Sequence, residues 1–372
     1  GPSTADRYLP IVDEDCLQLL GPRYAILQSE YAVARASNVH SGQSKRRVLI
    51  SFGGSDPTGE TARVVSALAS PEFADIAIAV VLGSRSVLTA DVRTALEMRP
   101  DAEVHIGLPT LADLLSNADL AVGASGAGTW ERMCLGVPAL VTTTTPAHSG
   151  VTEALTKAGL TTWAGIGGQV TTERYHELLA QQLLSDSSPR ELPLVDGFGA
   201  DRIAETIFGS RGSVHIGSAS PLDAPQFLGV DPGGPAGAGR QLAGPEVWST
   251  ELARFGRDMA DPDQLLLVPK LGALPLGRVR ARRTNNRVRV DFVLDDFLAG
   301  RNLGSLVAEI LASGTWAMRR GRLDFRGPAA KAGAKASSRN GDLYGSLDAT
   351  LGTISGPKSS SRKTDQEHDE VS

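Results

Sequence analysis

The sequence has few cysteines and aromatic residues, no long apolar run and no excess of basic charge. Its two cysteines, Cys16 and Cys134, lie far apart and form no CxxC motif. Cys134 falls in an apolar helical stretch, so we interpret it as a reduced core residue rather than a nucleophile. No segment reaches the roughly 18 apolar residues that span a bilayer, and no signal peptide is visible. The net charge of −5 is mild and shows no basic stripe. We therefore expect a cytoplasmic protein that binds no nucleic acid, membrane or metal.

The length and the patterning indicate two domains. A chain of 372 residues exceeds what one hydrophobic core usually organises. The chain begins Gly1-Pro2-Ser3 without a methionine, so we expect a fragment, a processed form or a tagged product. We divide it into a linker segment (1–46), an α/β domain (47–210), a second domain (211–352) and a polar tail (353–372). The tail has too few apolar residues to order itself.

The α/β domain alternates short apolar runs with amphipathic segments. A turn rich in glycine follows the first run, and Asp56-Pro57 is then expected to begin a helix, since proline suits the first helical position. Repeated strand–helix units with short connections predict a doubly wound parallel sheet. The expected strands cover residues 48–52, 76–82, 103–106, 119–123 and 139–142, and the expected helices begin near residues 56, 111, 129, 150 and 172.

The second domain has a different pattern. Proline, glycine and alanine cluster between residues 218 and 245, and strands are then expected at 265–268, 276–280 and 287–294. A helix from about 303 to 311 follows them. The pattern predicts a hairpin-rich sheet that feeds a helix, which makes this domain α+β rather than doubly wound.

Two glycine-rich turns in the α/β domain carry the chemistry. The first, SFGGSDP at residues 51–57, lies where a strand passes into a helix. Gly53 and Gly54 let the backbone approach a ligand closely, and Ser55 adds a hydroxyl. The helix start offers unpaired N–H groups and a positive dipole end, which suit a phosphate. The alternative is a plain strand-to-helix turn in which Asp56 caps the helix.

The second glycine turn, within GASGAGTWER at residues 123–132, gives the stronger signal. Its small residues, Ser125 and Gly126 among them, precede a helix expected to begin at Thr129, so that backbone amides can cradle a diphosphate. Glu131 lies in the first turn of this helix, where its carboxylate can accept hydrogen bonds from ribose hydroxyls. The alternative is that Glu131 only offsets the helix dipole. Both turns follow the carboxyl ends of strands, where open α/β sheets bind ligands.

These motifs resemble a known family. SFGGSDP and the longer stretch GLPTLADLLSNADLAVGASGAGTWERMCLGVPAL are similar to the carboxy-terminal lobe of the UDP-sugar hydrolase of pseudaminic acid biosynthesis. That family is related to spore-coat polysaccharide proteins and to MurG-type GT-B glycosyltransferases. GPRYAILQSEY at residues 21–31 resembles the segment that links its two lobes. The resemblance implies that the glycine turns hold the diphosphate of a UDP-sugar and that the helix glutamate holds the ribose. The implied site residues are Gly53, Gly54, Ser55, Ser125, Gly126, Thr129 and Glu131.

The chain departs from this family in two places. The family carries an amino-terminal lobe, with a catalytic histidine on a glycine-rich loop, before the matching segment. We expect the parent protein to have this lobe, although the chain lacks it. Where the family usually has Asn-Gln before the next helix, this chain has His148-Ser149. His148 is therefore a candidate catalytic or ligand-contacting residue, with a solvent-facing loop histidine as the alternative.

The second domain resembles a GNAT acetyltransferase in the order of its motifs. In that fold, backbone amides of a strand-to-helix loop bind the pyrophosphate of acetyl-CoA, with the pattern Arg/Gln-x-x-Gly-x-Gly/Ala. Here Ala299, Asn302 and Gly304 occupy the three fixed positions. Only the last glycine is retained, so we expect weak binding of acetyl-CoA. The resemblance implies Tyr344 as a general acid, although its spacing is several residues late; the alternative is a degenerate or structural module. The implied acetyl-CoA-binding residues are Gly300, Arg301, Asn302, Gly304 and Ser305.

The sequence thus predicts a two-domain enzyme of nonulosonic acid biosynthesis. Its first domain would belong to a hydrolase that releases UDP from a UDP-linked diacetamido sugar, and its second would N-acetylate an amino sugar. Two alternatives stay open. One is a GT-B glycosyltransferase that uses the same lobe for its donor, and the other is a nucleotide-binding module without catalytic activity.

Overall fold

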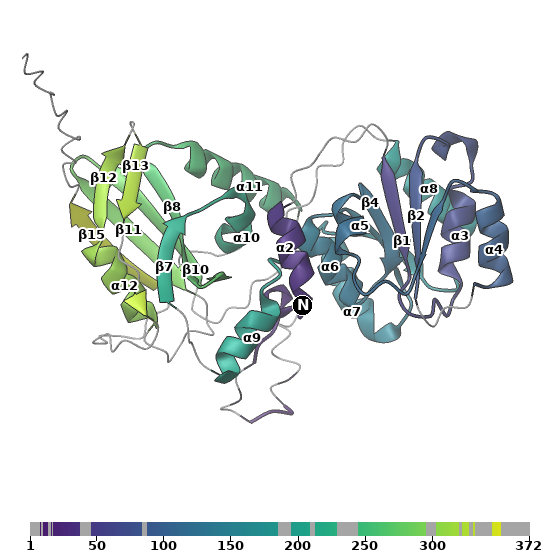
Figure 1. The fold of residues 1–372 in the computed structure, drawn as a ribbon, viewed down its shortest axis with the longest axis horizontal. Coiled ribbons are helices and arrows are strands. Elements are labelled where there is room, and N and C mark those ends of the chain that lie inside the picture. The colour runs from purple at the N-terminus through teal and green to yellow at the C-terminus, as the bar shows by residue number, and fades with distance from the viewer. Residues whose placement is uncertain are drawn as a thin grey trace, which may run out of the picture.

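Two domains lie side by side in the computed structural model, with α2 (Ser29–Ser37) and α9 (Gly199–Phe208) between them (Figure 1). The change from a parallel to an antiparallel sheet falls between α9 and β7 (Ser213–Ser218). The structure describes residues 8, 10–13, 16, 18–37, 46–83, 88–184, 195–208, 213–228, 245–294, 303–319, 322–326, 330–331 and 344–350.

The first domain is built on a six-stranded sheet of order β3-β2-β1-β4-β5-β6. Every pair of neighbours is parallel, and the order runs outward in both directions from β1 and β4. The predicted doubly wound sheet is therefore confirmed, with one further strand, β6, at its edge. The strands are β1 (Arg47–Ser51), β2 (Ala77–Leu82), β3 (Glu103–Ile106), β4 (Leu120–Ala124), β5 (Ala139–Thr143) and β6 (Thr162–Ile166).

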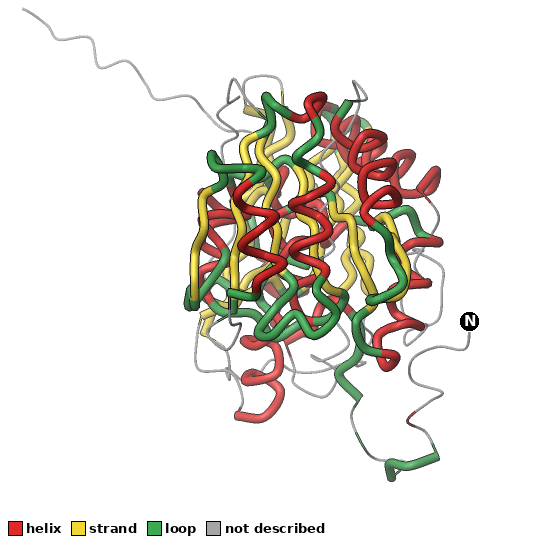
Figure 2. The backbone as a smooth tube through the Cα atoms, turned by 90° about the vertical axis from the view of Figure 1, so that its right-hand side faces the viewer, coloured by secondary structure: helices red, strands yellow, loops and turns green. Residues whose placement is uncertain are grey.

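Helices cover both faces of this sheet, because each presents one apolar stripe to the strands. One face packs against α3, α4 and α8, and the other against α2, α5, α6 and α7. Figure 2, which views this domain from its outer side, shows helices in front of the strands. As expected, Cys134 is a free cysteine with no exposed surface. It lies in the core between the sheet and helices α2, α5, α6 and α7. The helices are α3 (Glu60–Ala67), α4 (Ala90–Glu97), α5 (Ala112–Ser116), α6 (Ala127–Leu135), α7 (Ser149–Lys157) and α8 (Thr172–Leu183).

The predicted start of the helix after β1 is wrong. Asp56-Pro57 lies before the helix, and α3 begins only at Glu60. Gly59 adopts a left-handed conformation with φ 70°, which turns the chain before the helix can start. The carboxylate of Asp56 accepts the backbone N–H groups of Glu60 and Thr61 at 2.9 and 2.8 Å. Asp56 therefore caps the helix, which was the alternative interpretation of this turn.

The second domain is an antiparallel sheet of order β14-β7-β8-β10-β11-β15, with β9 paired to β8. Its core is formed by the inward side chains of β8, β10 and β11 together with α12. The expected strands and the helix after them are present, while the GNAT-like fold itself stays a prediction. The elements are β8 (Gln264–Leu271), β9 (Leu274–Pro275), β10 (Gly277–Thr284), β11 (Arg287–Leu294), β12 (Thr315–Arg319), β13 (Arg322–Arg326), β14 (Ala330–Lys331), β15 (Tyr344–Thr350), α10 (Ala224–Phe227), α11 (Pro245–Ala260) and α12 (Leu303–Ser313).

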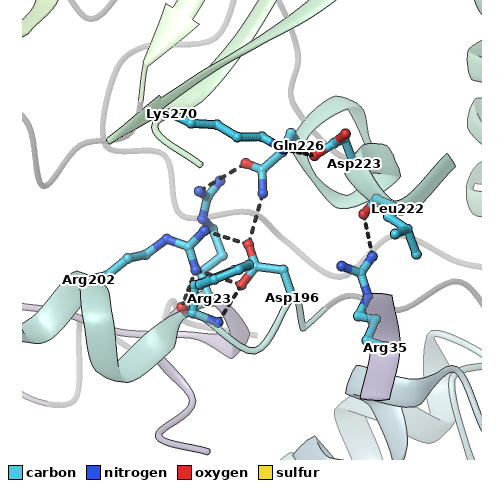
Figure 3. A network of polar contacts seen from close by, with 9 residues as sticks. Arg23, Arg35, Asp196, Arg202, Leu222, Asp223, Gln226 and Lys270 are labelled. Atoms are coloured by element: carbon cyan, nitrogen blue, oxygen red, sulfur yellow. Dashed lines mark hydrogen bonds and ion pairs between the residues drawn. The ribbon is translucent and has the colours of Figure 1, made fainter. Parts of the chain in front are cut away.

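The two domains share one core cluster and a buried polar network. Apolar side chains of α2 and α6 pack in the same cluster as Phe227, Phe255 and Leu266 of the second domain. Beside this cluster, Gln226 of the second domain donates to the carboxylate of Asp196, which precedes α9 (Figure 3). The domains therefore meet through both apolar packing and hydrogen bonds.

Candidate functional site

A cavity of about 560 Å³ opens at the carboxyl edge of the parallel sheet. It lies between the first glycine turn, which follows β1, and the second glycine turn, which follows β4. β1 and β4 are neighbours from which the strand order runs in opposite directions. The loops after such a pair separate and leave a crevice, which is where open α/β sheets bind ligands. The topology therefore brings together two motifs that lie about seventy residues apart in the sequence.

The second glycine turn has a backbone that only glycine accommodates easily. Gly126 has φ 135°, and a Cβ at this position would lie 3.1 Å from the imidazole of His148. α6 begins at Ala127, two residues before the expected start, so its first N–H groups lie directly beside this turn. The hydroxyl of Ser125 is buried and has no hydrogen-bond partner among the described residues. The turn thus presents amides and a hydroxyl at a helix N-terminus, an arrangement suited to an anion.

Arg132 places a positive charge beneath this turn, a role that we did not expect from the sequence. Its side chain lines the cavity and the residue is only 5% exposed. One guanidinium nitrogen donates to the carbonyl of Ala124 at 2.8 Å and to Oγ1 of Thr129 at 3.3 Å. Burial lowers the pKa of Arg132 to about 10, against the opposing effect of the Glu131 charge, so the group stays cationic at neutral pH. The available sequence signal was an arginine directly before the apolar run Met133-Cys134-Leu135.

Thr129 supports the second glycine turn from below. Besides accepting from Arg132, its Oγ1 accepts the backbone N–H of Gly126 at 3.3 Å. The residue is 6% exposed and does not belong to the cavity lining. Thr129 therefore joins the backbone of the turn to the guanidinium of Arg132 through its hydroxyl. Its contact with a nucleotide stays a prediction.

Glu131 lines the cavity one residue before Arg132 and lies close to Tyr31 of α2. The hydroxyl of Tyr31 accepts the backbone N–H of Leu111 at 3.2 Å. Burial, and secondly the charge of Glu131, raise the pKa of Tyr31 to about 12. Tyr31 also lines the cavity. We expected no role for it from the sequence, because it belongs to the linker segment.

The first glycine turn forms the opposite side of the cavity. Gly53, with φ 79°, and Gly54 both line it. Gly83 packs so closely that a Cβ there would lie 2.4 Å from the Cα of Gly54, so that this approach depends on glycine. Ser55 is exposed and lies outside the cavity lining.

His148 lies at the cavity rather than on a remote loop. It ends the 3-10 helix Pro146–His148 before α7, and its ring packs against Gly126. Its Nδ1 atom is buried and finds no hydrogen-bond partner in the described part of the chain. The position permits contact with a ligand, while a catalytic role stays a prediction.

The predicted acetyl-CoA residues are only partly described. Gly300, Arg301 and Asn302 lie outside the described residues. Gly304 and Ser305 fall in the first turn of α12, and Tyr344 is the first residue of β15, opposite Val293 of β11. The predicted roles of these residues are therefore not tested.

Two negative findings apply to the described ranges. No group of three or more His, Cys, Asp or Glu side chains there is arranged to hold a metal ion. Likewise, none of the described helices combines the length and apolar character that a transmembrane span requires.

Two curated proteins show sequence similarity to the chain, and no family model matches it. The spore coat polysaccharide biosynthesis protein SpsG of Bacillus subtilis is 29% identical over 191 residues, which are 49% of this chain and 56% of that protein. An uncharacterized protein of Methanocaldococcus jannaschii is 28% identical over 130 residues, 34% of this chain and 27% of that protein. The chain therefore spans about half or less of each of these relatives.

Solved structures that share part of the chain path include WaaG and MurG. WaaG, a glycosyltransferase of lipopolysaccharide biosynthesis, matches with a TM-score of 0.35 and 18% identity, over 51% of this chain and 54% of that chain. MurG of Acinetobacter baumannii matches with a TM-score of 0.32 and 18% identity, over 40% of this chain and 43% of that chain.

Proposed function

We propose that the first domain binds the diphosphate of a nucleotide sugar in the cavity at the start of α6. The buried guanidinium of Arg132 carries this proposal. Among the described residues no carboxylate lies within ion-pair distance of it, although Glu131 acts on it at longer range. A buried cation is costly unless an anion compensates it. A diphosphate above the second glycine turn would supply that charge. It would also accept hydrogen bonds from the N–H groups at the start of α6.

The nucleoside would lie toward Glu131 and the α2 side of the cavity. A carboxylate at this place can accept both hydroxyl protons of a ribose, which orients the nucleotide along the cavity. The UDP-sugar predicted from the sequence resemblance fits this arrangement, with uracil as the proposed base.

The reaction that we propose is glycosyl transfer from a nucleotide sugar in polysaccharide biosynthesis. The name of SpsG, a spore coat polysaccharide biosynthesis protein, supports a role in polysaccharide biosynthesis, and that role is carried over here only as a proposal because the chain spans 56% of that protein. In such a transfer the nucleoside diphosphate leaves with increased negative charge. Arg132 and the amides at the start of α6 would stabilise that charge as it develops.

Hydrolysis of a UDP-sugar is the second candidate, and the position of His148 favours it. An imidazole at the cavity whose Nδ1 has no hydrogen-bond partner among the described residues is suited to take a proton from an attacking water. The diacetamido sugar substrate of nonulosonic acid biosynthesis, and N-acetylation by the second domain with acetyl-CoA, are proposals that rest on the sequence resemblance alone.

Calorimetric titration of the 372-residue chain with UDP and with uridine tests the binding proposal. We expect UDP to bind at least about tenfold more tightly than uridine, since charge-assisted hydrogen bonds to the diphosphate are the strong ones. Glu131→Ala should weaken UDP binding by about 1–3 kcal/mol, whereas Glu177→Ala, on the exposed face of α8, should not. Equal affinities for UDP and uridine would contradict the diphosphate assignment.

The release of UDP from a UDP-sugar separates the two reactions. If transfer is correct, release by the chain without an acceptor should stay near the uncatalysed rate. Rapid release that His148→Ala abolishes, with UDP affinity retained, would favour hydrolysis instead.

A further inference from the structure

α2 contacts the cavity near its start and the second domain near its end. Its two buried residues are Tyr31 and Arg35, which lie one turn apart on the same face of the helix. Tyr31 lines the cavity, as does Gln28 directly before the helix, and the hydroxyl of Tyr31 accepts the backbone N–H of Leu111 at 3.2 Å. The start of α2 therefore forms a wall of the cavity, although it precedes β1 in the sequence.

Arg35 joins α2 to the second domain. The residue is 8% exposed, and its guanidinium donates to the carbonyl of Leu222 at 2.5 Å (Figure 3). Leu222 belongs to the 3-10 helix Pro221–Asp223, 187 residues further along the chain. Burying a guanidinium is costly unless it keeps hydrogen bonds, so this arginine ties α2 to that carbonyl.

The acceptor carbonyl is itself held in place within the second domain. The carboxylate of Asp223 accepts the backbone N–H and the hydroxyl of Ser220 at 2.9 and 2.8 Å, which closes the turn around Leu222. The ammonium of Lys270, in β8, lies 3.5 Å from the carboxylate of Asp223 (Figure 3). Arg35 therefore meets a carbonyl whose position the second domain fixes.

Apolar packing alone would define the position of α2 less closely. Tyr31 shares a core cluster with Phe227 and Phe255 of the second domain, but apolar contact is non-directional. A hydrogen bond is effective only over a narrow range of distance and angle. The bond from Arg35 therefore fixes where α2 lies between the domains, and with it the position of Tyr31 at the cavity.

We propose that Arg35 is a positioning residue through which the second domain holds α2 against the nucleotide site. The second domain thereby completes that site without contacting the nucleotide. This inference rests on the proposed function. The effect is reciprocal, since coupled equilibria act in both directions: a nucleotide that contacts the start of α2 tightens the contact between α2 and the second domain.

Calorimetric titration of UDP into wild type, Arg35→Met and Arg35→Lys tests the positioning. Methionine keeps an unbranched stem and removes the hydrogen bond, so Arg35→Met should bind UDP about threefold to tenfold more weakly. Lysine keeps the charge and a donor, so Arg35→Lys should bind UDP more tightly than Arg35→Met does.

Arg99→Met is the matched control. Arg99 is similarly buried, at 6% exposed, and donates to the backbone carbonyls of Leu68 and Ile76. These partners lie within the first domain, and none of the three residues belongs to the cavity lining. Arg99→Met should lose stability in urea denaturation and keep its UDP affinity.

Hydrogen exchange gives a readout that a merely structural arginine would not change. Residues 222–228 of the second domain do not belong to the cavity lining. Saturating UDP should slow amide exchange in this segment of the wild type, because a tighter contact with α2 suppresses local opening there. In Arg35→Met, saturating UDP should leave the exchange of this segment unchanged.

Two outcomes would overturn the inference while the proposed function stands. One is wild-type UDP affinity in Arg35→Met, and the other is unchanged exchange of residues 222–228 when UDP saturates the wild type. The second measurement applies even if Arg35→Met does not fold. Failure of the wild type to bind UDP would instead contradict the proposed function, and the inference with it.

Discussion

The substitution Asp196→Asn should weaken the contact between the two domains. It should lower the free energy of unfolding more than the loss of an exposed ion pair does. The carboxylate of Asp196 accepts four donors: the N–H of Phe198 at 3.1 Å, two guanidinium nitrogens of Arg202 at 2.8 and 2.5 Å, and the side-chain amide of Gln226 at 2.9 Å. Arg202 has no exposed surface. Arg202 also donates to the carbonyl of Arg23, and Arg23 donates to Gln226 (Figure 3).

An asparagine at this position keeps the shape and removes the charge. Its NH₂ group would face a donor, and Arg202 would be left as a buried cation without its counter-ion. Breaking one side of a buried ion pair costs about 3–5 kcal/mol. We therefore expect the free energy of unfolding to fall by about that amount in urea denaturation, followed by tryptophan fluorescence. Glu177→Gln, in the exposed Arg174–Glu177 pair, should change it by less than about 1 kcal/mol.

The pH dependence gives the same prediction an independent check. Burial alone would raise the pKa of Asp196, but the hydrogen bonds and the charge of Arg202 outweigh it and hold the pKa well below its ordinary value. The stabilisation is therefore complete above the unfolded value of about 3.9 and is lost as the pH falls from there toward the folded value. The difference in stability between wild type and Asp196→Asn should be constant from pH 5 to 8 and shrink below about pH 4. A difference under about 1 kcal/mol at pH 7, or one that does not shrink in acid, would refute this reasoning.

Three further predictions concern single residues. Gly126→Ala should weaken UDP binding at least about tenfold, because φ 135° is strained for alanine and its Cβ would meet His148. Gly217→Ala, where a Cβ meets no atom within 4 Å, is the control in the same titration. Burial raises the pKa of Cys134 to about 12, so iodoacetamide at pH 8 should label the exposed Cys16 and leave Cys134 unmodified until denaturation; equal labelling by mass spectrometry would contradict its burial. In a titration, acetyl-CoA should bind the wild type weakly, and Asn302→Gly should increase the affinity for acetyl-CoA. No binding by either protein would favour a structural second domain.

The parallel sheet was predictable because its inner strands are short apolar runs that helices separate. β6 was not predicted because it lacks such a run: this edge strand is only half-buried and contains Gly165. The start of α3 was misplaced because Pro57 suits a first helical position, while the structure uses the side chain of Asp56 as a cap and Gly59 to turn the chain.

The glycine turns of the candidate site were predictable from the rule that ligands bind at the carboxyl edge of an open sheet. The groups that complete the site were not. Tyr31 contacts Leu111, which lies 80 residues away in the sequence, and no local pattern indicates such a pair. Arg132 was visible as a charged residue in the helix after the second glycine turn, but its place beneath the turn depends on the packing of α6 against β4.

A crystal structure of the full chain grown with UDP tests the central claim most directly. We predict the diphosphate at the start of α6, within hydrogen-bond distance of the backbone amides of Ala127 and Gly128, and the ribose hydroxyls on the carboxylate of Glu131. UDP bound elsewhere, or a diphosphate in this cavity that contacts neither the second glycine turn nor the start of α6, would contradict it.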